Sequence, residues 1–243
     1  MFPVLMIDDN LDQENKEKSR KRLKYLFSNS NFVISEFEKN PDFTDSLESE
    51  KDIILRSLNK AREINPGSNC FLLKDTSTTM FGPEDIYEIL QYNLKDFDLL
   101  YLCRWCDSCN LYRNLEEFAG ISIATTHRPQ GFQAVMISPK VRDMILSPSF
   151  EYKDFLSNII SKMTYNRFLR AKTVVYNVFN FDMDFARVNS DYEKLNQCAY
   201  VVPKADSGIN SSTYFFVGSL VALIVIAGVG LYAVGPKKTK EEN

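Results

Sequence analysis

Short apolar runs alternate along the first two hundred residues with longer segments in which apolar positions recur every three or four residues. The short runs predict strands and the longer segments predict amphipathic helices. We expect strands at 2–7, 32–37, 70–73, 98–103 and 131–138, and helices at 12–28, 44–65, 83–94 and 140–146. This alternation predicts one α/β domain over residues 1–202, with a mostly parallel sheet flanked by helices.

A different pattern follows near the end, where the stretch from Tyr214 to Val234 carries no charge and is followed at once by GPKKTKEEN. About 20 apolar residues are what a helix needs to cross a bilayer, whereas a buried core helix is usually shorter. We therefore predict a polar linker at 203–213, a transmembrane helix at 214–234 and a short basic tail at 235–243, with the lipid bilayer as a partner.

Residue types within the predicted span indicate how it would lie in the membrane. Tyr214, Phe215 and Tyr232 fall near its ends, where amphipathic aromatic rings prefer to sit. Small residues offer close-approach points for a membrane-helix partner, although glycine is also common in spanning helices that have none. These small residues are Gly218, Ala222, Gly228 and Gly230.

The orientation of the anchor rests on two opposed signals. The amino-terminal sequence MFPVLMIDDN has no basic region and only a short apolar start, so it is not a secretory signal. We therefore expect a single-pass, tail-anchored protein with the large domain in the cytosol. Lys237, Lys238 and Lys240 beyond the span favour the reverse orientation.

Charge and motifs exclude several classes of function. The formal net charge is −3, and no basic stretch indicates a nucleic-acid partner. The sequence has no P-loop, no nucleophile elbow and no dinucleotide-binding glycine fingerprint. These absences count against an NTPase, an α/β-hydrolase and a Rossmann oxidoreductase.

Four segments, taken in order, share a pattern with a known family. They are IDDNLD at 7–12 followed by RKR at 20–22, FLLKDTS at 71–77, FDLLYL at 97–102 and GFQAVMIS at 131–138. In this order and spacing the chain resembles a divergent member of glycosyltransferase family 25, the lipopolysaccharide and collagen galactosyltransferase-like proteins. The resemblance covers roughly residues 1 to 192.

The resemblance implies a GT-A, Rossmann-like fold that transfers a sugar from a nucleotide-sugar to a glycan or protein acceptor. In that family a carboxylate pair at the end of the central strand holds manganese or another divalent cation. The matching place here reads Lys74-Asp75-Thr76, so only Asp75 remains as a carboxylate. Lys74 would then neutralise phosphate directly, and Asp8 and Asp9 would lie near the nucleotide. Alternatively, Lys74 and Asp75 are ordinary residues at a strand end.

Three further groups of residues are secondary candidates. Asp182 and Asp184 form a D-x-D pair whose side chains would share one side of a strand, as either a metal site or solvated carboxylates. His127 and Arg128 stand in a loop and suit a general base or a phosphate contact, or simply an exposed loop. Cys103, Cys106 and Cys109 have spacing that permits a thiolate metal site, a redox pair or unbonded cysteines.

Two functions therefore remain after the sequence has been read. One is a membrane-anchored glycosyltransferase-like protein with an altered metal motif. The other is a non-catalytic, membrane-anchored structural or interaction protein on the same fold, for example in the virion membrane of a large DNA virus. The altered acidic motif favours the second function, and fold alone does not determine activity. On the family resemblance, we nevertheless take a glycosyltransferase-like protein as the first interpretation and the non-catalytic protein as the alternative.

Overall fold

The computed structural model describes residues 1–181 apart from residues 10, 95, 104–114, 128 and 130. The predicted linker, transmembrane helix and basic tail lie outside these residues. Within the described part of the chain, no helix combines the length and the apolar character needed to span a membrane.

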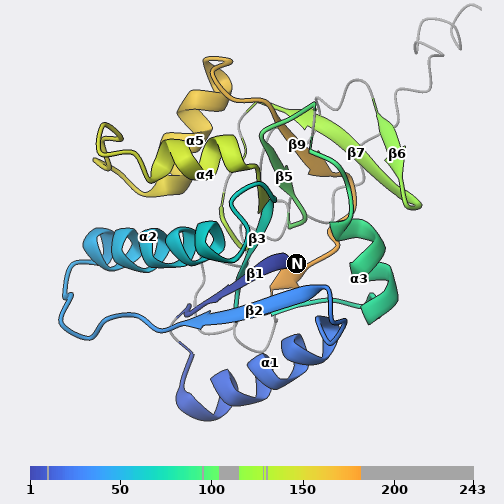
Figure 1. The fold of residues 1–243 in the computed structure, drawn as a ribbon, viewed down its shortest axis with the longest axis horizontal. Coiled ribbons are helices and arrows are strands. Elements are labelled where there is room, and N and C mark those ends of the chain that lie inside the picture. The colour runs from blue at the N-terminus through green and yellow to red at the C-terminus, as the bar shows by residue number, and fades with distance from the viewer. Residues whose placement is uncertain (10, 95, 104–114, 128, 130, 182–243) are drawn as a thin grey trace, which may run out of the picture. The chain divides into compact units, whose positions relative to one another are not determined.

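Among the described residues, eight strands form one sheet in the order β2-β1-β3-β8-β5-β9-β7-β6 (Figure 1). Their bounds are β1 Phe2–Ile7, β2 Phe32–Phe37, β3 Cys70–Lys74, β5 Leu99–Tyr101, β6 Glu116–Phe118, β7 Ile121–Thr126, β8 Ala134–Ile137 and β9 Ala171–Val174. Two short strands, β4 (Ser77–Thr78) and β10 (Asn180–Phe181), pair separately. The five strands and four helices predicted from the sequence are all present, with ends that shift by a few residues.

The sheet is mixed, which corrects the prediction of a mostly parallel one. The pairs β1–β2, β1–β3 and β5–β9 are parallel, but β8 lies antiparallel between β3 and β5. Strand β7 is antiparallel to both β9 and β6. An apolar run identifies a strand but carries no information on its direction, and for this reason the sequence pattern of β8 was compatible with either pairing.

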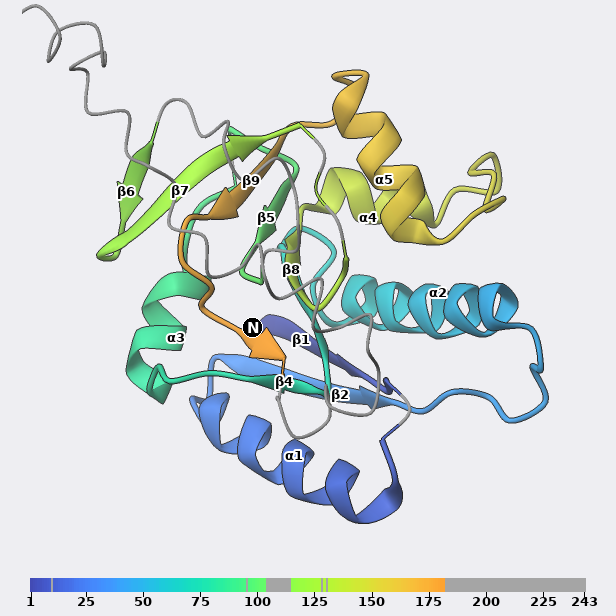
Figure 2. The ribbon, with the colours of Figure 1, turned by 180° about the vertical axis from the view of Figure 1, so that it is seen from behind.

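Five helices among the described residues cover the two faces of the sheet: α1 Gln13–Leu26, α2 Ser46–Ile64, α3 Pro83–Leu90, α4 Pro139–Ile145 and α5 Leu156–Tyr165. Successive side chains of a strand point to opposite faces. Accordingly, Val4 and Met6 of β1 pack with α1 and α3, whereas Leu5 and Ile7 pack with α2, α4 and α5. Figures 1 and 2 show these two groups of helices on either side of the sheet.

Capping residues set where the first two helices begin, directly after the loops that follow β1 and β2. The Asp12 carboxylate accepts a hydrogen bond from Asn15 N at 3.0 Å, and the Asp45 carboxylate accepts from Leu47 N and Glu48 N. Such caps satisfy backbone donors that the first helical turn leaves unpaired. The start of α2 therefore lies close to the carboxyl ends of the strands, where it contributes residues to the pocket described next.

Candidate functional site

The carboxyl ends of β1, β2 and β3 meet at one edge of the sheet. Register places Ile7 beside both Phe37 and Lys74, so the residues that follow these positions converge. Strand β8 runs the other way and therefore begins at this same edge, where Lys74 N donates to Gln133 O at 2.9 Å. Ligands of open α/β sheets bind at such strand ends.

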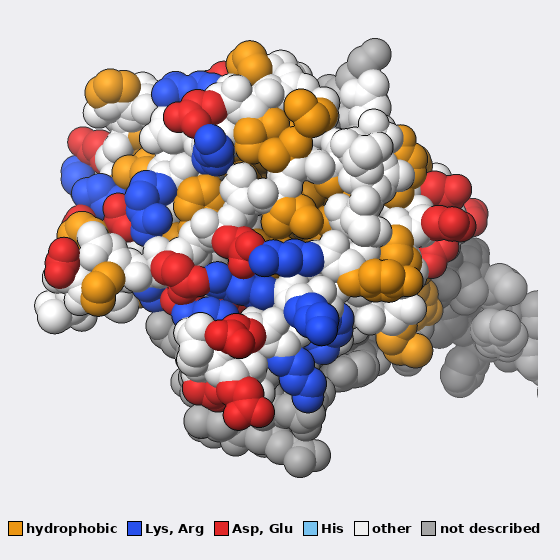
Figure 3. Space-filling view, turned by 60° about the horizontal axis from the view of Figure 1, so that its bottom comes forward, with side chains coloured by type: hydrophobic (Ala, Val, Ile, Leu, Met, Phe, Trp, Pro, Cys, Tyr) orange, Lys and Arg blue, Asp and Glu red, His pale blue; other side chains and the backbone are white. Residues whose placement is uncertain are grey.

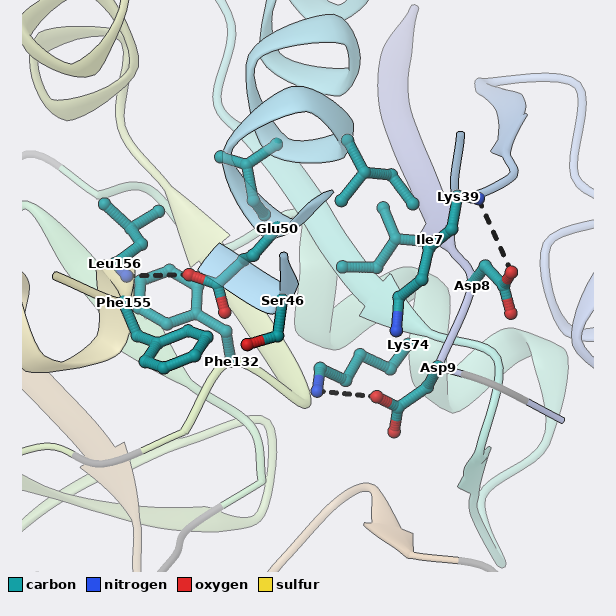
Figure 4. A pocket seen from close by; sticks show the side chains of 12 residues that line it. Ile7, Asp8, Asp9, Lys39, Ser46, Glu50, Lys74, Phe132, Phe155 and Leu156 are labelled. Carbon is teal, nitrogen blue, oxygen red and sulfur yellow. Dashed lines mark hydrogen bonds and ion pairs between the residues drawn. The ribbon is translucent and has the colours of Figure 1, made fainter. Parts of the chain in front are cut away.

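A pocket with a volume of about 140 Å³ opens at this edge (Figure 4). One part of its wall is apolar, and the other part is charged. The apolar part comes mainly from α2, from the segment before β8 and from the start of α5; its residues are Ile7, Ile53, Ile54, Phe132, Phe155 and Leu156. The polar lining residues are Asp8, Asp9, Lys39, Ser46, Glu50 and Lys74.

Two lysines and two carboxylates, those of Asp8 and Asp9, form the charged end of the pocket. Lys74 Nζ lies 2.8 Å from Asp9 Oδ1, and Thr76 Oγ1 donates to Asp9 Oδ2 at 2.8 Å. Lys39 extends from the end of β2 toward Lys74 (Figure 4). Burial lowers the pKa of Lys39; the charge of Asp9 opposes this effect and that of Lys74 adds to it. The ammonium groups of Lys39 and Lys74 and the carboxylates of Asp8 and Asp9 thus line one end of the pocket.

Asp75, the predicted metal ligand, lies beneath the pocket with no solvent exposure. Its Oδ1 accepts from Asp9 N at 2.9 Å, and its Oδ2 accepts from Arg20 Nε at 3.2 Å and from Nη2 at 3.0 Å. Burial raises the pKa of Asp75 to about 6, against the lowering effect of the Asp9 N–H and of Arg20. Asp75 therefore holds α1 and the end of β1 against β3.

The cations of α1 are themselves shared among several carboxylates. Arg20 also pairs with Glu38 and lies 3.6 Å from Glu36. Lys16 Nζ is 3.1 Å from Asp8 and 2.8 Å from Glu38. In the centre of the face seen in Figure 3, positive and negative side chains lie next to one another. Most charges near the site are thus neutralised within the protein.

The side chains at the site do not fit a divalent cation. Both carboxylate oxygens of Asp75 are occupied, and those of Asp9 bond Lys74 and Thr76. Asp8 pairs with Lys16. Nowhere in the described part of the chain do three or more His, Cys, Asp or Glu side chains gather in a way that could hold a metal. The described residues thus give no support to the predicted divalent cation, and its alternative ligands, Asp182 and Asp184, lie outside them.

No family model and no curated protein matches this sequence. The chain is similar in structure to a glycosyltransferase involved in the glycosylation of the major capsid of PBCV-1, with a TM-score of 0.49, 9% identity and coverage of 80% of this chain and 100% of that one. A197 from STIV gives a TM-score of 0.43 at 10% identity, covering 74% and 83% of the two chains. Apo-UDP-glucose pyrophosphorylase gives 0.38 at 8% identity, covering 79% and 81%.

These similarities are too distant to assign an activity. None of them identifies glycosyltransferase family 25, so that resemblance stays a prediction. The function is therefore inferred from the side chains of the site.

The structure brings the primary candidates together and leaves the secondary ones apart or outside. Asp9 is at the centre of these primary candidates, because it contacts Lys74, Thr76 and Asp75. Asp8 is its neighbour in the chain. His127 is exposed at the end of β7 and does not line the pocket, and Cys103 is buried. Outside the described residues lie Arg128, Cys106, Cys109, Asp182, Asp184, Tyr214, Phe215, Gly218, Ala222, Gly228, Gly230 and Tyr232.

Several pocket residues escaped the sequence analysis: Lys39, Ser46, Glu50, Phe132 and Phe155. A signal existed for Lys39, which follows the predicted second strand just as Asp9 follows the first. Nothing in the sequence indicated that Glu50 lines a pocket, because segments distant in the chain, including the start of α5, hold its side chain there. Its carboxylate accepts from Leu156 N at 2.7 Å and from Tyr152 Oη at 3.1 Å, residues about a hundred positions away.

Proposed function

We propose that this chain is a glycosyltransferase-like protein whose pocket at the ends of β1, β2 and β3 binds a nucleotide-sugar. The observation that carries the proposal is the division of the pocket wall into an apolar part and a charged part. A nucleotide has the same division, with a flat base at one end and phosphates at the other.

The apolar part suits the base. Phe132 is almost fully buried, and Phe155 is 37% exposed at the rim. Aromatic rings of this kind pack well against a flat heterocycle. The Glu50 carboxylate points into the space between them and Ser46 (Figure 4), where it offers an acceptor to a base N–H group.

The volume limits how much of the ligand the pocket would enclose. Pockets that surround a whole small-molecule ligand measure roughly 300 to 1,000 Å³. A volume of about 140 Å³ is smaller. We infer that the base enters the pocket and that the phosphates lie at its charged rim, with the sugar beyond them and open to an acceptor. Transfer of that sugar to a glycan or protein is the activity that the family resemblance implies.

A thermal-shift experiment on the full chain in detergent tests this proposal. A panel of UDP-, GDP-, ADP- and CMP-sugars would be added, each with and without manganese. A ligand at a hundred times its Kd stabilises a protein by about 2.7 kcal/mol, which corresponds to a rise in Tm of about 5 °C or more for a domain of this size. We expect such a rise for at least one donor.

Paired variants locate the binding. Phe155→Ala removes the ring at the pocket rim, whereas Phe168→Ala removes a ring that is 70% exposed and does not line the pocket. The first should lose most of the ligand-induced shift, and the second should keep it.

The non-catalytic alternative keeps one specific observation in its favour, which is that the strand-end residues do not fit a metal. It predicts no stabilisation by any nucleotide-sugar in a chain that unfolds cooperatively. That result would count against nucleotide-sugar binding and favour the non-catalytic alternative.

A further inference from the structure

Three carboxylates line the pocket, and two of them, those of Asp8 and Asp9, form ion pairs with lysines. The third belongs to Glu50, which comes from α2 and faces the apolar part of the wall near Phe132 and Phe155 (Figure 4). In the part of the chain that the structure describes, no ion pair joins Glu50 to a lysine or an arginine. Glu50 thus lies where the proposed function places the base of the nucleotide.

One oxygen of the Glu50 carboxylate is held in place by the protein. Oε1 accepts from Leu156 N at 2.7 Å and from Tyr152 Oη at 3.1 Å. Burial, together with the charge of Glu50, raises the pKa of Tyr152, so the hydroxyl keeps the proton that it donates. Among the described residues, Oε2 has no hydrogen-bond partner. The two bonds to Oε1 therefore orient the carboxylate, and Oε2 keeps two lone-pair sites for a ligand.

A hydroxyl group lies on the same wall of the pocket. Ser46 precedes Glu50 by four positions on α2, and residues four apart share one face of a helix. The side chains of both residues are directed into the pocket (Figure 4). A hydroxyl donates as well as accepts, whereas an ionised carboxylate only accepts. The wall thus offers a charged acceptor with a donor on the preceding turn of the helix.

The four common bases differ in how well they match these two groups. Guanine carries two neighbouring donors, N1–H and the 2-amino group, with the acceptor O6 beside them. Adenine and cytosine carry a ring-nitrogen acceptor beside their amino group, and uracil has a carbonyl on each side of its single N–H. A carboxylate would therefore face an acceptor lone pair of adenine, cytosine or uracil, which leaves that polar group without a partner.

We propose that the pocket selects guanine, with Glu50 Oε2 accepting from N1–H and the 2-amino group and Ser46 Oγ donating to O6. This inference rests on the proposed function and names the donor class as a GDP-sugar. Glu50 is then the residue that determines base specificity.

Isothermal titration of the full chain in detergent tests the inference with GDP, ADP, UDP and CDP, in buffer with manganese and again with EDTA. GDP should bind with a Kd at least about tenfold lower than that of any of the other three. Inosine diphosphate, which differs from GDP only in lacking the 2-amino group, should bind about fivefold or more weakly than GDP. This comparison uses the parent chain and does not depend on the folding of a variant.

Glu50→Gln reverses the hydrogen-bonding character of the group that faces the ligand. The amide oxygen can still accept from Leu156 N and Tyr152 Oη, so the amide nitrogen takes the place of Oε2 and presents a donor. The Kd for GDP should rise about tenfold or more. Xanthosine diphosphate has a carbonyl in place of the 2-amino group, and it should bind Glu50→Gln more tightly than it binds the parent chain.

A matched control is the same substitution elsewhere on α2. Glu63→Gln changes an exposed carboxylate that pairs with Lys60 and does not line the pocket. Its Kd values should equal those of the parent chain for every diphosphate. Thermal melting of each variant checks that it is folded.

The possible failures are distinct. Tightest binding of ADP, UDP or CDP, or equal binding of GDP and inosine diphosphate, overturns guanine selection and leaves the proposed function standing. A folded Glu50→Gln chain that binds GDP as tightly as Glu63→Gln does overturns the assignment of Glu50. No binding of any diphosphate in either buffer, by a chain that melts cooperatively, refutes the proposed function and this inference with it.

Discussion

Two adjacent residues at the end of β3, Lys74 and Asp75, have opposite environments. Lys74 faces the pocket, and Asp75 is buried on Arg20 and on the backbone of Asp9. Alternation along an extended chain separates neighbours in this way. Removing the Asp75 carboxylate from water costs free energy of folding. Arg20 recovers only part of this cost, because its guanidinium also contacts two glutamates.

This cost predicts how the stability of the domain depends on pH. The pKa of Asp75 in the folded chain is about 6, above its ordinary value of 3.8. The folded state thus holds this proton more tightly than the unfolded state, so the contribution to stability is complete below pH 4 and is lost as the pH rises through 6. Relative to Asp75→Asn, the parent should lose roughly 2 kcal/mol of unfolding free energy between pH 4 and pH 7.

Urea unfolding of both chains across this pH range measures the difference. Asp42→Asn, a change at an exposed carboxyl, is the control and should follow the parent chain at every pH. A difference between parent and Asp75→Asn that does not change with pH would contradict the role given to burial.

At the scale of elements, hydrogen bonds from one arginine join helix α4 to the turn that follows α2. Arg142 of α4 is 1% exposed and donates to three backbone carbonyls of that turn. The acceptors are Asn65 O and Ser68 O, both at 3.3 Å, and Pro66 O. These carbonyls follow the end of a helix and precede β3, so Arg142 helps to set where β3 begins.

Arg142→Met should therefore be strongly destabilising. The methionine fills much of the space but leaves the carbonyls without their donor, and each buried polar group without a partner costs about 1 to 3 kcal/mol. We expect a loss of about 3 kcal/mol or more in unfolding free energy by chemical denaturation. Arg62→Met, on the exposed side of α2 where Arg62 bonds only Asn59 among the described residues, should change it by less than about 0.5 kcal/mol. Equal effects of the two variants would refute this account.

At the scale of the whole molecule, the sequence predicts that the described domain is joined to a membrane anchor. The prediction rests on the uncharged stretch at 214–234 and is independent of the pocket. A domain held at a membrane would meet acceptors that are themselves bound to that membrane.

Membrane fractionation of cells that express the chain tests the anchor. The full chain should remain with membranes after an alkaline wash, and a chain ending at residue 202 should be released. Protease added to sealed vesicles whose cytosolic face is outward should digest the large domain. Recovery of the full chain in the soluble fraction would show that the 214–234 stretch does not span a bilayer, and protection from protease would reverse the orientation.

Much of the framework was predictable from local pattern. The strand–helix alternation located the strands that form one half of the sheet and the first four helices, because apolar periodicity and capping residues act over a few positions. Asp9 and Lys74 follow predicted strands, and the structure brings them into contact at one edge of the sheet; their role in binding stays a prediction. Strands β6, β7 and β9 of the sheet and helix α5 were missed, since their apolar patterns are short and are completed only by packing on the rest of the domain.

The sequence by itself determined the strand and helix segments, the uncharged stretch near the end and the Lys74-Asp75 pair at the end of the third predicted strand. The tertiary structure decided the direction of β8, the burial of Asp75 on Arg20 and the convergence of Lys39 with Lys74 in one pocket. The physical reason is that periodicity and capping depend on neighbours in the chain. Strand direction, burial and the charge balance of a pocket depend on residues tens to a hundred positions apart, which only the folded chain brings together.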